Sequence, residues 1–269
     1  MGKILLFLLL LSGPLSVIAQ SYDKEFQTVF VWEVKQIDEF IERFNDSDKT
    51  LIKEYYKKID TSTAFTRERL IKGLFNAEGK NWNFGEITTF IGQVTDPQHP
   101  QYLDFFGGNW NATVKCAVAY KGKQKVIIFT MALQKMPNGS SKWVITGADA
   151  PFLRVPAIQK HLIKIPDSRD TAISLNPVSN ATDFLNIDKV SKDKANLKNY
   201  FLQAESYNND IPLVENEILN GHLIINKTVT VIYNFRQVPG WEMEIEQFNR
   251  QTRNSGWLIS KLTKLQENQ

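Results

Sequence analysis

The 269-residue sequence contains one cysteine and three histidines, and these low numbers exclude several kinds of site. The single cysteine, Cys116, rules out an intrachain disulfide and any metal site built from several thiolates. It lies in an alternating apolar pattern, which predicts a buried and unreactive thiol. His99, His161 and His222 lie far apart and form no His-x-x-x-His pair, so we expect no metal site and no cofactor.

Excess charge and long apolar runs are also scarce. Lys and Arg number 32 against 29 Asp and Glu, and the two signs are interspersed. This balance does not predict a nucleic-acid partner. After residue 20 no apolar run approaches the length of about 18 residues that a membrane span needs, so no span is expected. A nucleophile elbow, a P-loop and a dinucleotide fingerprint are missing too, and we assign no catalytic residue.

The first residues are the most informative part of the chain. Lys3 precedes an unbroken apolar run over residues 4–11, which Gly13 and Pro14 end. A small residue, Ala19, then follows at the position of a cleavage site. This order is typical of a secretory signal peptide. We therefore predict a signal peptide over residues 1–19 and export to the periplasm or the outside of the cell.

Residues 20–150 predict a first α+β domain. Apolar residues at helical spacing indicate an amphipathic helix over residues 25–45, and Thr66 is a plausible N-cap for a second helix. A three-stranded meander should follow, with Pro137, Asn138 and Gly139 in its second turn. The expected elements are helices 25–45 and 67–75 and strands 112–120, 127–133 and 143–146.

Residues 151–177 hold several prolines and little periodicity, which predicts a linker before a second, divergent α+β domain over 178–269. Short helices are expected over 181–190, 193–203 and 212–219, and strands over 229–235, 241–245 and 257–260. Two stretches of the first meander recur at similar spacing, which indicates a duplication. Asn111-Ala-Thr-Val114 matches Asn226-Lys-Thr-Val229, and Trp143-Val-Ile-Thr146 matches Trp257-Leu-Ile-Ser260. We expect two domains, each a curved antiparallel sheet packed on short helices.

Helices followed by a curved antiparallel sheet with an aromatic-rich connection resemble the nuclear-transport-factor-two-like superfamily of cone-shaped α+β domains. The resemblance rests on the helices over 25–45 and 67–75 and on the strands that end near Trp143. It covers residues 25–150, and the second half only through its strands. It implies a scaffold that hosts isomerases, dehydratases and binding modules, so it leaves the function open.

Aromatic residues gather between positions 80 and 145, and they could line an apolar pocket or fill a core. We take Trp82, Tyr102, Asp104, Phe105 and Trp110 as candidate binding residues. Asp104 beside Phe105 could also act as a base inside an apolar cone. No histidine pairs with it in the pattern that enzymes of the resembling fold use.

These observations favour an exported, soluble binding or interaction protein with no catalytic activity, acting on a protein or a small-molecule ligand. One alternative is a hydrolase or isomerase that works in the cone of the first domain. Another is a component of a surface assembly whose second domain supplies an interaction face. A deep cavity with converging polar groups would favour the enzyme, and a filled cone would favour the binding protein.

Overall fold

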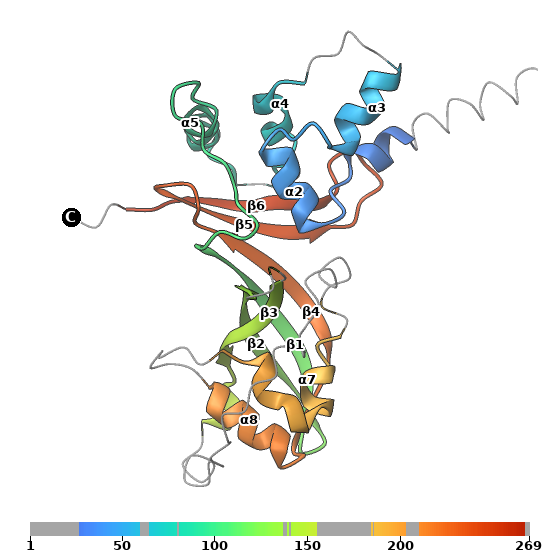
Figure 1. Ribbon diagram of the computed structural model, residues 1–269, viewed down its shortest axis with the longest axis vertical. Coiled ribbons are helices and arrows are strands. Elements are labelled where there is room, and N and C mark those ends of the chain that lie inside the picture. The colour runs from blue at the N-terminus through green and yellow to red at the C-terminus, as the bar shows by residue number, and fades with distance from the viewer. Residues whose placement is uncertain are drawn as a thin grey trace, which may run out of the picture.

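A single antiparallel sheet of six strands, in the order β3-β2-β1-β4-β5-β6, runs through the molecule (Figure 1). The computed structural model describes residues 27–59, 65–79, 81–136, 139, 141–154, 184, 186–202 and 210–266. The predicted signal peptide and most of the predicted linker lie outside these residues. The α+β class is confirmed. The strands are β1 (Trp110–Tyr120), β2 (Lys123–Lys135), β3 (Ser141–Asp149), β4 (Leu223–Phe235), β5 (Trp241–Phe248) and β6 (Gly256–Lys264).

The two predicted meanders share this one sheet, because their first strands, β1 and β4, pair with each other. The expectation of two separate sheets is therefore wrong. Ala112 of β1 lies opposite Tyr233 of β4. On their other sides, Ala112 pairs with Met131 of β2 and Tyr233 pairs with Ile245 of β5. This gives the sheet a local two-fold arrangement in which β3 and β6 are the two outer strands. The boundaries at 150 and 178 stay a prediction.

The N-terminal helices lie away from the meander that follows them in the sequence, whereas the later helices contact strands of both meanders. The N-terminal helices lie over β5 and β6, in the upper lobe of Figure 1, and the later helices lie over β1–β4 in the lower lobe. The helices at the start of the chain therefore cover part of the second meander. The first group is residues 27–32 with α2 (Ile37–Phe44), α3 (Leu51–Ile59), α4 (Arg67–Lys72) and α5 (Phe84–Val94). The second is α7 (Lys189–Lys192), the 3-10 helix η3 (Lys194–Tyr200) and α8 (Ile211–Leu219), and a short 3-10 turn η1 (Pro151–Leu153) follows β3.

Backbone bonds join both outer strands to segments that follow these helices. On β6, the Ile259 N–H donates to Leu74 at 2.8 Å and its carbonyl accepts from Asn76 at 3.0 Å. On β3, the carbonyl of Ile145 accepts from Leu202 at 2.9 Å. Because edge strands with free backbone groups promote association, these short pairings protect part of each edge. The Trp-led strands therefore occupy matching places, as the duplication predicts. The Val114–Val229 match is wrong, because the strand pairings put Phe235 at the place in the second meander that Val114 holds in the first.

The predicted helix over 25–45 is in fact two helices, 27–32 and α2, separated at Val34. The Val34 N–H donates to Ser255, and its carbonyl accepts from Trp257 at 2.8 Å, so this residue extends the sheet. The buried Arg43 guanidinium donates to the carbonyls of Val31, Trp32 and Glu33. It thereby satisfies the carboxyl end of the first helix. Burial lowers the pKa of Arg43 to about 10, so the group stays charged at neutral pH. The N-cap at Thr66 is confirmed.

Replacement of Gly256 by alanine should cost about 3 kcal/mol or more, because two penalties coincide there. Gly256 has a φ of +83°, and an added Cβ would lie 2.0 Å from the Val34 carbonyl oxygen. Urea denaturation measures the loss. Gly122→Ala is the matched control, since Gly122 has a φ of +77° and open space around it. Equal losses in the two variants would contradict the close contact between Val34 and β6.

A continuous aromatic core joins the two lobes. Trp110 on β1 stacks on Phe235 of β4 with ring centres 4.7 Å apart, and it also contacts Trp143 on β3. Tyr233 contacts both Trp143 and Trp257, the leading residues of the two outer strands. Most buried apolar residues of both lobes belong to one hydrophobic cluster, and Val31, Ile52 and Leu70 form a second, smaller one. The covered face of the sheet is therefore filled with side chains where the sequence allowed an open cone.

The thiol of Cys116 should react with a thiol reagent only after denaturant is added. Cys116 is fully buried on β1, and burial raises its pKa to about 12. Because the pKa is higher in the folded chain than in the unfolded chain, the thiol's contribution to stability is present below about pH 9. It is lost as the pH rises toward 12. Rapid stoichiometric labelling of the native protein would show that this strand face is exposed.

Candidate functional site: a groove beside strand β6

The five predicted binding residues do not form one pocket. Trp110 is buried in the core, and its indole N–H donates to the Phe105 carbonyl at 3.1 Å. Phe105 is half-buried and packs against Trp110 with ring centres 5.4 Å apart. These two aromatic residues therefore pack against each other and stabilise the fold.

Tyr102 and Asp104 lie in the connection between α5 and β1. The Arg67 guanidinium lies over the exposed ring of Tyr102, 4.3 Å from its centre. The exposed Asp104 accepts the Phe106 N–H through its carboxylate at 2.9 Å. Its backbone exchanges two further hydrogen bonds with the Gln237 side chain. These bonds hold a turn in the connection.

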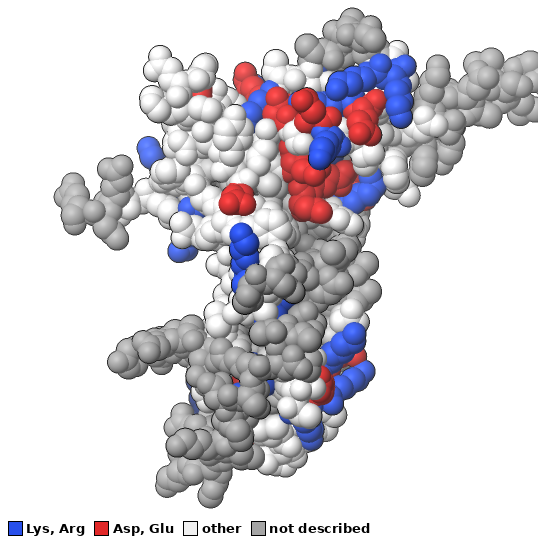
Figure 2. Space-filling view, viewed as in Figure 1, with Lys and Arg blue, Asp and Glu red and all other residues white. Residues whose placement is uncertain are grey.

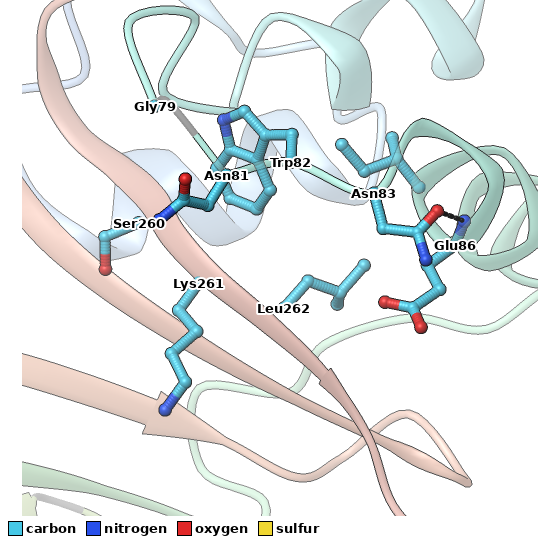
Figure 3. Close-up of a pocket in the computed structure, with 9 residues that line it drawn as sticks. Gly79, Asn81, Trp82, Asn83, Glu86, Ser260, Lys261 and Leu262 are labelled. Carbon is cyan, nitrogen blue, oxygen red and sulfur yellow. Dashed lines mark hydrogen bonds between the residues drawn. The ribbon is translucent and has the colours of Figure 1, made fainter.

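Trp82 is the one predicted residue that lines a pocket, and the pocket lies between α5 and β6 (Figure 3). The indole is half-buried, packs edge-on against Phe75 and donates its N–H to the Asn76 carbonyl at 2.8 Å. Both contacts fix the ring and leave it facing a space of about 310 Å³. We call this space the β6 groove. Its lining residues are Gly79, Asn81, Trp82, Asn83, Glu86, Ile87, Ser260, Lys261 and Leu262.

Two walls of the groove differ in chemistry. On the α5 side, the Asn83 carboxamide accepts the N–H groups of Gly85 and Glu86, which starts the helix and sets Glu86 in its first turn. On the strand side, Leu262 faces the same space as Trp82, whereas the Lys261 amine points away (Figure 3). That amine pairs with Glu244 at 2.6 Å, and this hydrogen bond raises the pKa of Lys261. The groove thus combines an apolar floor with amides and a single carboxylate.

Along the groove, the outer edge of β6 has no backbone partner among the described residues. The bond from the Asn76 N–H to the Ile259 carbonyl is the last one that a described segment makes to this edge. In an antiparallel ladder, alternate residues direct their backbone groups to opposite sides. A bulge at Ser260 shifts this alternation by one residue, so Leu262 and Lys264 direct their backbone groups outward. No described residue bonds to those groups. A ligand in the groove would therefore meet free donors and acceptors.

Acidic side chains gather over α2 in the upper lobe (Figure 2). Burial, with Asp38 and Glu39 nearby, raises the pKa of Glu42. One Glu39 carboxylate oxygen accepts the Lys35 N–H at 2.8 Å. In the described part of the chain, no group of three histidine, cysteine or acidic residues is arranged to hold a metal ion. The α2 cluster is therefore a charged surface and does not form a pocket.

Sequence reasoning missed most of the groove. Asn81, Asn83 and Glu86 belong to a helix start that the sequence analysis did not identify, although Asn83 is a good N-cap residue. Leu262 was not assigned a role, because the edge position of β6 depends on pairing between distant strands. Trp82 and the recurring Trp-led strands were the two signals that pointed to this part of the chain.

Comparison of the chain with protein-family models, with curated proteins and with solved structures finds no match. The resemblance to the nuclear-transport-factor-two-like superfamily therefore stays a prediction from the order of elements. Within the described ranges, no helix has the length and hydropathy that a membrane crossing requires.

Proposed function

We propose that this protein is an exported binding protein that holds a protein or small-molecule ligand in the β6 groove and catalyses no reaction. Export rests on the signal-peptide pattern of residues 1–19. Binding rests on the groove, a space of about 310 Å³ between the fixed indole of Trp82 and a strand edge that has no backbone partner among the described residues. Concave sites with an apolar wall and a few polar groups are typical ligand sites.

The polar groups of the groove support binding over catalysis. Asn81 and Asn83 carry neutral amides and Ser260 carries a hydroxyl, which donate and accept hydrogen bonds without exchanging protons near neutral pH. The Ser260 hydroxyl donates to the Glu244 carbonyl at 3.1 Å and so stabilises the strand bulge. Glu86 is the one carboxylate in the lining. These groups can orient a ligand that the indole of Trp82 contacts.

Site-specific photocrosslinking tests this proposal in the native host. The full chain should carry benzoylphenylalanine in place of Asn81, an exposed residue of the groove lining. The matched control carries it in place of Val229, an exposed side chain on β4 that does not line the groove. We expect an adduct from position 81 and none from position 229. Equal labelling of both positions, or no adduct from position 81, would refute the site.

A further inference from the structure

The outer strands β3 and β6 can be compared residue by residue. Each carries one extra residue opposite its inner neighbour, Thr146 in β3 and Ser260 in β6. In both strands the hydroxyl of that residue donates to the neighbouring strand's carbonyl, at 3.3 Å from Thr146 and 3.1 Å from Ser260. The preceding residues, Ile145 and Ile259, each accept a backbone bond from a segment that follows a helix, from Leu202 after η3 and from Asn76 after α4. The two edges therefore correspond in register.

This register equates Ala148 of β3 with Leu262 of β6, and Ala150 with Lys264. On the β3 side, the buried Asp210 bonds to the edge. Its N–H donates to the Ala148 carbonyl at 3.0 Å, and its carboxylate accepts the Ala150 N–H at 2.6 Å. Arg154 adds an ion pair to the same carboxylate at 2.8 Å. One aspartate thus bonds to two alternate residues of the strand edge.

The corresponding edge of β6 lacks such a residue among the described segments and is bordered by the β6 groove. The Leu262 carbonyl and the Lys264 N–H occupy the places of the two groups that Asp210 bonds. The exposed side chain of Lys264 makes this end of the edge basic, whereas the Lys261 amine is paired with Glu244 and points away from the groove. Glu86 is the one acidic residue in the groove, and it belongs to α5, across the space from the strand.

The geometry points to an extended segment of another polypeptide, bearing an aspartate, as the ligand that pairs with the outer edge of β6. This inference rests on the proposed binding function and specifies its ligand. The aspartate N–H donates to the Leu262 carbonyl, and its carboxylate accepts the Lys264 N–H. A neighbouring apolar side chain of the ligand packs against Trp82. Strand addition of this kind takes its affinity from backbone bonds and its selectivity from pockets beside the edge.

A second copy of this chain fits the edge less well than an acidic ligand. Two β6 edges that paired with each other would bring Lys264 of one copy near Lys264 of the other. Like charges that face each other across strands destabilise the pairing, and edge lysines are a common protection against it. An aspartate brings the opposite charge to the same place.

A probe can be taken from the chain itself, because residues 208–213 contain Asp210, the residue that bonds to the β3 edge. We would titrate the capped peptide acetyl-Asn-Asn-Asp-Ile-Pro-Leu-amide into the isotope-labelled protein, residues 20–269, and follow backbone amide signals. We expect the largest shifts at Leu262 and Lys264. A peptide with alanine in place of the aspartate should bind at least about tenfold more weakly, as should one with an N-methylated aspartate, because each removes one of the two bonds.

Two protein variants test the strand edge itself. Lys264→Pro removes the outward N–H and should weaken peptide binding at least about tenfold, since proline is tolerated where a strand edge faces solvent. Lys264→Ala keeps that N–H and should bind within a few-fold of the wild type. The peptide substitutions decide the matter if Lys264→Pro does not fold.

Shifts at Ala148 and Ala150 instead would mean that the peptide exchanges with Asp210 on β3, and would overturn the inference. Equal binding of the aspartate and alanine peptides would do the same, as would binding that Lys264→Pro leaves unchanged in a folded protein. If none of the peptides binds while position 81 still crosslinks to a native ligand, the groove is a binding site and the ligand class is wrong. If both experiments fail, the proposed function fails as well.

Discussion

Residues 20–165, expressed alone, should fail to unfold in a cooperative transition, although the sequence predicts a first domain within these limits. The reason is that the N-terminal helices pack on the second meander. In the intact chain, α2 and the segment around Phe75 pack on β6, which this fragment lacks. The apolar face of α2, which includes Phe40 and Phe44, would lose its partner strands. Circular dichroism and urea titration of the fragment measure the effect.

Co-expression with residues 178–269 provides the control for this experiment. That second fragment restores β4, β5 and β6, so the two together should regain a cooperative transition and a stable complex. A sharp transition of residues 20–165 alone would show that the helices and the first meander form a self-sufficient unit. In that case the packing of the N-terminal helices on β6 adds little to stability.

Much of the strand content was predictable because period-2 patterns are local. Residues 112–120 and 127–133 alternate clearly, and the structure has strands β1 and β2 there. The pattern of β4 was recognised only from residue 229, although the strand begins at Leu223. Register shifts against β1 leave Asn226 and Val229 without a direct partner, so the alternation is interrupted. A bulge changes which face the following residues occupy, and periodicity alone cannot show it.

The pairing of strands was not predictable, because each meander is a plausible sheet by itself. Nothing local to residues 110–120 shows that their second neighbour is β4. The same limit applies to the helix over 25–45. Its apolar stripe is real, but Val34 leaves the helix to pair with Gly256, a residue more than two hundred positions away. Long-range backbone bonds overrode the local preference at this point.

The candidate site shows the same division. Trp82 was identified as one of the aromatic residues gathered after position 80, and it does line the β6 groove. Tyr102, Asp104, Phe105 and Trp110 were grouped with it because they lie nearby in the sequence. The structure separates them, since residues 95–109 carry the chain from α5 to the central strand β1. Proximity in sequence was therefore a poor guide to a site formed by a helix start and a distant strand edge.

Replacement of Trp110 by alanine should lower the free energy of unfolding by about 3–5 kcal/mol, as expected for a buried tryptophan. Its side chain is 7% exposed and contacts four other rings, from Phe105, Trp143, Tyr233 and Phe235. Because Trp110 lies where β1 meets β4, the cavity would open between the two meanders. Urea denaturation gives the loss. Tyr102→Ala is the control, since that ring is 55% exposed, and it should cost about 1 kcal/mol or less.

The same two variants separate a core role from a binding role for Trp110. If the indole acts only in the core, the fraction of Trp110→Ala protein that remains folded should retain its groove. Crosslinking from position 81, scaled to the folded fraction, should then equal that of the wild type. A variant that melts like the wild type but loses the crosslink would place Trp110 in contact with the ligand. That result would contradict the stacking on Phe235, because an indole that contacts four rings in the core has no face left for a ligand.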